Sequence, residues 1–139
     1  MKSVFSTAVC VLGLTLCVGC GGGEEGPELG QVSGVVTLDG QPVASADVTF
    51  TPDQGRPSMG QTDDEGKYRL RYSAESDGAL PGMHSVSIST QRDQTGGEGD
   101  QPLVPAQEER IPAKYNEETE LSREVSAGEN TIDFELTSE

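Results

Sequence analysis

The residues that could carry chemistry in this chain are few, and most of them are carboxylates. There is one histidine, His84, and the 3 cysteines all lie within the first 20 residues. A catalytic triad needs a nucleophile with a partnered base, and a transition-metal site needs several histidine or thiolate ligands. A lone histidine with no later cysteine supports neither. The composition therefore predicts no enzyme, no cofactor and no transition-metal site.

His84 is the only candidate for acid–base chemistry, and its phase along the chain favours the core. His84, Val86 and Ile88 occupy every second position, so the three side chains share one face of a strand expected over residues 83–90. An imidazole can replace an aromatic ring at such a position. We therefore expect a core or boundary histidine, and the alternative is a catalytic or metal-binding role.

Carboxylates cluster at Asp63, Asp64 and Glu65, where they could offer oxygen ligands to Ca²⁺. The cluster lacks the alternating ligands and the distant bidentate glutamate of an EF-hand loop. A structural turn is the favoured interpretation, with Asp63 accepting backbone N–H groups and Gly66 at a positive φ. Two further acidic runs are expected to be solvated charge: Glu108 and Glu109, and Glu117, Glu118 and Glu120.

Short strands must position these side chains, and the clearest signal lies between Gly60 and Tyr72. The segment predicts a hairpin, with a short strand, an acidic turn closed by glycine, and a second strand of strict alternation. A period of two is typical of a strand with one buried and one wet face. The side chains expected inside are Tyr68, Leu70 and Tyr72, and those expected outside are Lys67, Arg69 and Arg71.

Similar alternation recurs along the rest of the chain. It predicts strands over residues 31–38, 46–52, 83–90, 121–125 and 131–136, and a short extended segment over 111–115. The inward side chains include Ala46, Val48 and Phe50 in one strand and Ile132, Phe134 and Leu136 in the last. No segment has a helical period longer than about two turns. About six or seven short strands with regular turns predict a single all-β sandwich.

Three polar loops could carry a ligand such as a sugar, a peptide or Ca²⁺: residues 53–58, 73–80 and 92–108. The last is long for a compact domain, and such loops are either functional or disordered. Disorder is favoured, because only Leu103 and Val104 offer anything to pack. The ring of Tyr115 is expected to pack across one end of the sandwich, and a surface contact is the alternative.

The N-terminal region predicts a targeting segment followed by a tether. Residues 1–19 contain an apolar run of about 15 residues, which is short for a membrane-spanning helix and typical of a secretory signal. Its end resembles a bacterial lipoprotein processing site, which implies cleavage before Cys20 and a lipid on the Cys20 thiol. Cys17 stands where leucine is usual, so a plain secretory signal is the alternative. Gly21 after the lipidated position favours the outer membrane, by analogy with such lipoproteins. Residues 20–30 are polar and glycine-rich, which predicts a flexible tether.

The charge balance excludes several classes of partner. The chain has 24 acidic and 9 basic residues, and its formal net charge is −15. Such a surface repels nucleic acid and anionic lipid headgroups. We expect a solvated acidic exterior in place of a specific metal site. Without cysteines, the part of the chain after the tether must fold by packing and strand pairing alone.

Taken in order, the turns and strands resemble the carboxypeptidase regulatory-like domain. The segments that carry the resemblance are 32–36, 39–43, 46–50, 62–68 and 81–86, with a tail at 112–116 and 128–131. The resemblance covers nearly all of residues 31–139. It implies a Greek-key sandwich of the transthyretin-like (prealbumin-like) type, and none of its motifs is a catalytic set. His84 departs from the pattern, because the family more often has tyrosine there.

Together these observations predict three parts: a signal peptide over 1–19, a tether over 20–30 and a sandwich domain over 31–139. The expected function is a non-enzymatic structural or interaction module, held at the membrane of the cell envelope by a lipid on Cys20. An envelope protein is the expected partner, without an identity, and nucleic acid is excluded. The alternative is a module that binds carbohydrate, peptide or calcium through its loops.

Overall fold

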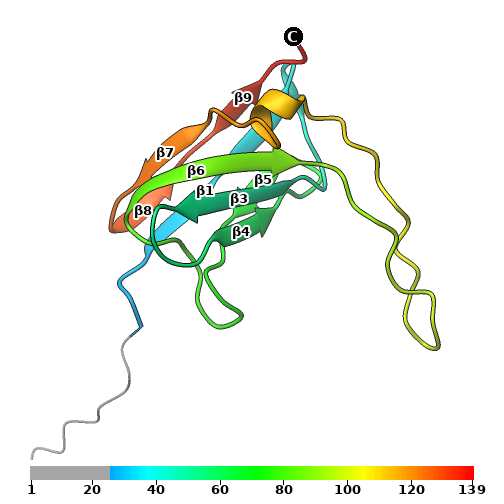
Figure 1. The fold of residues 1–139 in the computed structure, drawn as a ribbon, viewed down its shortest axis with the longest axis horizontal. Coiled ribbons are helices and arrows are strands. Elements are labelled where there is room, and N and C mark those ends of the chain that lie inside the picture. The colour runs from blue at the N-terminus through cyan, green and yellow to red at the C-terminus, as the bar shows by residue number, and fades with distance from the viewer. Residues whose placement is uncertain (1–25) are drawn as a thin grey trace, which may run out of the picture.

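Alternating apolar residues build two facing β-sheets in the computed structural model, which describes residues 26–139. The predicted all-β sandwich is confirmed, and Figure 1 shows its two layers. One sheet contains β1 (Gly30–Leu38), β2 (Gln41–Pro42), β5 (Lys67–Arg69), β8 (Gly128–Thr131) and β9 (Phe134–Leu136). The other has the order β4-β3-β6-β7, with β3 (Asp47–Pro52), β4 (Ser58–Gln61), β6 (Gly82–Ser89) and β7 (Ser122–Val125).

Strand β1 is the centre of the five-stranded sheet, because it is paired along both of its edges. On one edge it runs antiparallel to β5 and to β2. On the other edge it runs parallel to β8, which pairs with its first half, and to β9, which pairs with its second half. The N-terminal and C-terminal strands of the domain therefore lie side by side.

The core lies between the sheets and follows the predicted alternation. In the four-stranded sheet Phe50 lies opposite Val86 and Val48 opposite Ile88, and all four side chains are buried. The ring of Phe50 makes an edge contact with Phe134 of the other sheet, with 6.1 Å between the ring centroids. Each of these rings removes a large apolar area from water, which stabilises the contact between the sheets.

The sequence predicts a hairpin from Gly60 to Tyr72. The structure instead has a corner between the two sheets in this segment. Strand β4 pairs with β3, whereas β5 pairs with β1. One isolated bridge, between Met59 and Arg71, joins the two sheets next to this corner. The chain therefore passes from one layer to the other through the acidic turn. The predicted inward faces of Tyr68 and Leu70 are nevertheless confirmed, since both are buried.

Two further expectations about the C-terminal segments are wrong. The strand predicted over 131–136 is interrupted, because β8 ends before Ile132 and β9 begins after Asp133. At this break Asp133 Oδ1 accepts the N–H of Val35 at 2.9 Å, so a side chain replaces a ladder hydrogen bond. The extended segment predicted over 111–115 ends in a 3-10 turn, η1 (Ala113–Tyr115).

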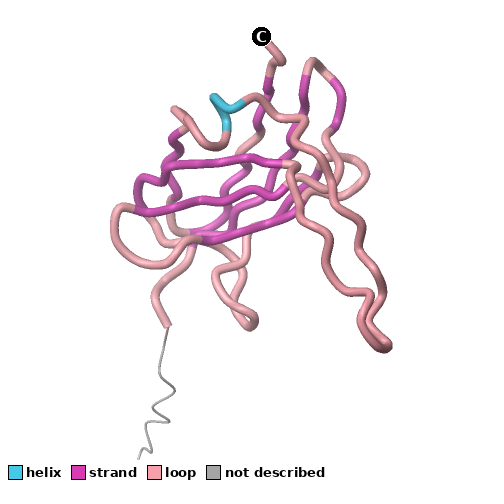
Figure 2. The backbone as a smooth tube through the Cα atoms, turned by 45° about the vertical axis from the view of Figure 1, so that its right-hand side comes forward, coloured by secondary structure: helices cyan, strands magenta, loops and turns pink. Residues whose placement is uncertain are grey.

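The sandwich has two ends that carry different loops. At the entry end, where β1 begins, the Gly30 N–H donates to the Ala79 carbonyl at 2.9 Å, and loops 53–57 and 73–81 lie nearby. At the far end, Asp47 pairs with Ser89, where β3 begins and β6 ends. Figure 2 shows a long loop leaving this region and projecting away from the strands.

Candidate functional site

The most conspicuous feature outside the sandwich is the arm, which we define as residues 91–108. Its two sides are paired, with backbone bridges between Arg92 and Gln107 and between Thr95 and Val104. The four N–H···O bonds of these bridges measure 2.8–3.0 Å. The expected disorder of 92–108 is therefore wrong, and the segment is an extended two-sided ribbon (Figures 1 and 2).

The outer part of the arm exposes apolar side chains. Leu103 is 56% exposed and Val104 is 39% exposed. The other large apolar residues that are exposed within 26–139, Met59 and Met83, lie elsewhere on the sandwich. Single exposed apolar residues need no explanation, but Leu103 and Val104 follow each other on a projecting ribbon and are both open to contact.

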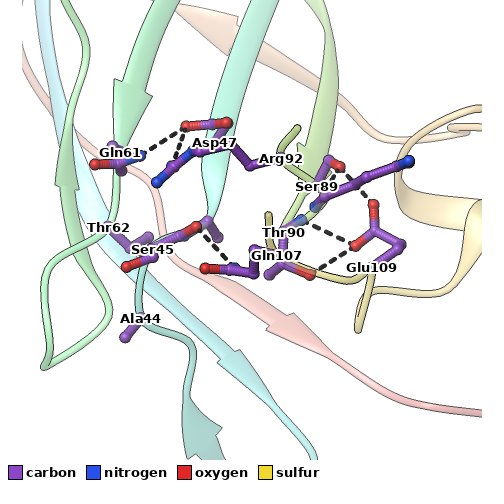
Figure 3. Close-up of polar contacts among 12 residues, drawn as sticks. Ala44, Ser45, Asp47, Gln61, Thr62, Ser89, Thr90, Arg92, Gln107 and Glu109 are labelled. Carbon is purple, nitrogen blue, oxygen red and sulfur yellow. Dashed lines mark hydrogen bonds and ion pairs between the residues drawn. The ribbon is translucent and has the colours of Figure 1, made fainter. Parts of the chain in front are cut away.

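Glu109 fastens the returning side of the arm to the end of β6. Its Oε1 accepts hydrogen bonds from the Thr90 N–H, the Thr90 hydroxyl and the Ile111 N–H, each at 2.9 Å. Its Oε2 accepts a short hydrogen bond from the Ser89 hydroxyl. Figure 3 shows this carboxylate against Ser89 and Thr90. The expectation that Glu109 is only solvated charge is therefore wrong.

The electrostatics of Glu109 follow from these contacts. Burial alone would raise the pKa of its carboxyl. The hydrogen bonds from Ser89, Thr90 and Ile111 outweigh burial, and they lower the pKa from 4.5 to about 2. The ionised carboxylate is the form that holds the arm.

A second set of contacts holds the outgoing side of the arm. The Arg92 guanidinium lies 3.6 Å from Asp47 Oδ1, and Gln61 Nε2 donates to the same oxygen at 3.1 Å (Figure 3). On the returning side of the arm, Gln107 Nε2 donates to the Ser45 carbonyl at 3.4 Å. We call the contacts of Glu109 and Asp47 the latch. The latch fixes both sides of the arm at its base and leaves its outer part free.

The latch could not be recognised in the sequence. Its partners Thr90 and Glu109 are 19 positions apart and belong to no spacing motif. The one usable signal is that Ser89 and Thr90 lie at the end of an alternating strand, where hydroxyls commonly satisfy backbone or carboxylate groups.

The structure places His84 in the core, as expected. The residue is 2% exposed, and its ring lies 5.8 Å from that of Phe50. Its Nε2 is 2.6 Å from the Leu80 carbonyl, which fixes Nε2 as the protonated nitrogen. Nδ1 has no hydrogen-bond partner within the described residues. In this position the imidazole packs as an aromatic ring.

The acidic turn also has the predicted structural role. Asp63 Oδ1 accepts the N–H groups of Glu65 and Lys67, both at 2.9 Å. Gly66 has a φ of 76°, and its N–H donates to the Asp63 carbonyl at 3.0 Å. The Asp63 carboxylate therefore stabilises the corner between the sheets.

The three loops considered as a ligand site do not converge. Loops 53–58 and 73–80 lie at the entry end, whereas 92–108 begins and returns at the far end. The bases of the three loops therefore do not lie at one end of the sandwich. Tyr115 packs partly against the core, as expected, and its hydroxyl accepts the N–H of Thr137 at 3.1 Å.

The remaining acidic residues are exposed, in keeping with solvated charge: Glu108, Glu117, Glu118 and Glu120. Between residues 26 and 139 no group of three or more histidine, cysteine, aspartate and glutamate side chains is arranged to hold a metal ion. The same stretch contains no helix that is long and apolar enough to cross a membrane. The predicted signal peptide over 1–19 and the predicted lipidation site at Cys20 lie outside the described residues, as does the part of the predicted tether before Gly26.

No protein-family model and no curated protein matches the chain.

Proposed function

We propose that this protein is a non-enzymatic, lipid-anchored module of the cell envelope, with the arm as its contact element. The lipid would be carried by Cys20, with the outer membrane as the favoured location. The partner is an envelope protein that contacts the outer part of the arm.

The observation that carries the proposal is the construction of the arm. A loop that merely connects β6 to β7 could be short, whereas this one extends as a paired ribbon. Its base is fixed by Glu109 and Asp47, and its outer part exposes Leu103 and Val104. Fixing a contact segment before it binds lowers the entropy lost on association. The apolar pair would supply the buried centre of a small interface.

The chain enters the sandwich at Gly30, at the entry end, and the base of the arm lies at the far end, near Asp47. We also propose that the domain is of the carboxypeptidase regulatory-like, Greek-key type. The two-sheet sandwich supports this, because the motifs that carry the resemblance lie in β1, β3, the 63–66 turn and β6.

The test is photo-crosslinking in living cells. A photoreactive amino acid replaces Leu103, and in a matched protein it replaces Glu135, which is exposed on β9 of the sandwich. We expect a discrete crosslinked species from position 103 and none of that size from position 135. Breaking the latch with Glu109→Gln and Arg92→Ala should weaken the species from position 103.

The same crosslinked species from both positions would contradict the role of the arm. The absence of any species at position 103 would contradict it as well. In either case the sandwich would have to reach its partner by another surface.

A further inference from the structure

A broad depression lies beside the corner between the two sheets. We call it the groove. It has a volume of about 740 Å³ and runs over the exposed side of β1 and β5. Its lining comes from four regions: Ser33, Gly34 and Val35 of β1; Gly60 and Gln61 of β4 with Asp63 after it; Lys67, Tyr68, Arg69 and Arg71; and Thr131 and Asp133 beside the break between β8 and β9.

The groove is basic, although the protein is strongly acidic. Lys67, Arg69 and Arg71 all line it, whereas the whole chain has 9 basic residues against 24 acidic ones. Two carboxylates, Asp63 and Asp133, also line it. Each of them already accepts backbone N–H groups through Oδ1, so both are engaged in holding the fold.

Arg69 is the central cation of the groove. Its neighbours have ion pairs, Lys67 with Glu65 at 3.0 Å and Arg71 with Asp77 at 3.6 Å. Both of these pairs are largely exposed, and exposed pairs exchange at little cost. Arg69 itself has no ion-pair partner among residues 26–139. It also lines a second depression of about 240 Å³, next to Gln31 and Asn130.

The spacing of the three cations defines the ligand. They occupy every second position of one extended segment, while Tyr68 and Leu70 between them are buried. Side chains two residues apart on a strand repeat at roughly 6.6–6.8 Å. An extended peptide with an acidic residue at every second position has the same repeat. Each carboxylate could then meet one cation, and a guanidinium can bind a carboxylate through two hydrogen bonds.

We propose that the groove binds an extended acidic peptide whose carboxylates alternate with small polar residues. Arg69 is the anchor of this site, and Lys67 and Arg71 exchange their present partners for ligand carboxylates. The floor of Ser33 and Val35 leaves room for small side chains between the carboxylates. This site is separate from the contact surface of the arm, so either can fail without the other.

The test measures binding of a fluorescent peptide of alternating glutamate and serine to the full-length chain in a non-ionic detergent. Ionic strength is kept at about 0.15 M, because the Debye length is then about 8 Å and repulsion from distant acidic residues is screened. Two control peptides are used. One has glutamine in place of glutamate, and the other has its glutamates in a single block.

We expect the alternating glutamate peptide to bind at least tenfold more tightly than either control. Arg69→Ala should weaken its binding at least tenfold, and Arg69→Lys should weaken it less. Arg56→Ala is the matched control, since Arg56 is exposed, lies outside the groove and stacks on Tyr72 at 5.3 Å. Leu103→Ser tests independence from the arm and should leave the affinity unchanged.

Two outcomes would overturn the proposal. One is an affinity that does not depend on the carboxylates or on their spacing. The other is an equal loss in Arg69→Ala and Arg56→Ala, which would mean that the peptide responds only to overall charge. Unchanged melting of each variant shows that a loss of binding is not a loss of fold.

Discussion

The hydroxyl of Tyr68 donates a hydrogen bond of 2.5 Å to the backbone carbonyl of Ile132. The contact ties β5 to the break between β8 and β9, on the opposite edge of the same sheet. It passes over Gly34 of β1, whose missing side chain leaves room for the ring. Burial raises the pKa of Tyr68, so the phenol stays a donor throughout the physiological range.

Tyr68→Phe should lower the free energy of unfolding by about 1–3 kcal/mol, because the Ile132 carbonyl loses its partner inside the protein. Urea denaturation of the two proteins measures the difference. Tyr115→Phe is the control, since that hydroxyl lies near the surface beside Thr137. An equal loss of unfolding free energy in both variants would show that the hydrogen bond from Tyr68 to Ile132 stabilises the fold no more than the surface contact of Tyr115 does.

Gly34→Ala should be more harmful than loss of the hydroxyl. A Cβ at position 34 would overlap the Ile132 carbonyl and press on the Tyr68 ring at 3.0 Å. Overpacking of this kind costs about 1–3 kcal/mol, and more where backbone must move. The matched change is Gly26→Ala, where nothing lies within 4 Å. Thermal melting that ranks the two variants equally would contradict the close approach of β1 and Ile132.

Phe50→Ala and Phe134→Ala should each lower the free energy of unfolding by roughly 3–5 kcal/mol. Both rings are at most 1% exposed and contact each other between the two sheets. The measurement is urea unfolding followed by circular dichroism. Unchanged midpoints would mean that these rings do not form the centre of the sandwich.

Glu109→Gln should remove a pH-dependent part of the stability. The folded pKa of Glu109, about 2, lies below its ordinary 4.5, so the carboxylate stabilises the fold fully above about pH 4.5. This contribution is lost as the pH falls from 4.5 towards 2. The stability difference between wild type and variant should therefore shrink across that range. Glu108→Gln, at an exposed neighbour, is the matched control for the loss of one surface charge.

Cys20→Ser should release the protein from membranes, because the thiol that would carry the lipid is removed. Anchoring by buried acyl chains is worth about 0.8 kcal/mol per methylene, so its loss should be complete. Cell fractionation with immunodetection measures the distribution. Cys17→Ser is the control and should stay in the membrane fraction. A Cys20→Ser protein that still sediments with membranes would contradict the lipid anchor.

Much of the fold could be predicted from the sequence because its strands are buried on one face only. The alternation placed Val48, Phe50, Val86 and Phe134 in the core, and all four are buried. What alternation could not supply is the partner of each strand. The segment from Gly60 to Tyr72 has every local signal of a hairpin, yet its two strands belong to different sheets, since pairing is decided by distant residues.

The candidate site was the least predictable part. The arm contains few apolar residues, and its order comes from backbone pairing and from Glu109, neither of which leaves a local pattern. The basic side chains at 67, 69 and 71 were visible as an outward face. They line one groove together with β1 and with the end of β4, because the chain turns a corner between the sheets. Local periodicity does not encode that corner.

The parallel pairing of β1 with β8 and β9 has a consequence for how the chain acquires its structure. Residues Val35 and Asp133, which meet at this seam, are 98 positions apart. The first strand made by the ribosome must therefore wait for the last one before its second edge is closed. Contacts of such long sequence separation slow folding and expose unpaired strand edges. We expect the chain to stay unfolded during synthesis and to fold only after β9 has emerged.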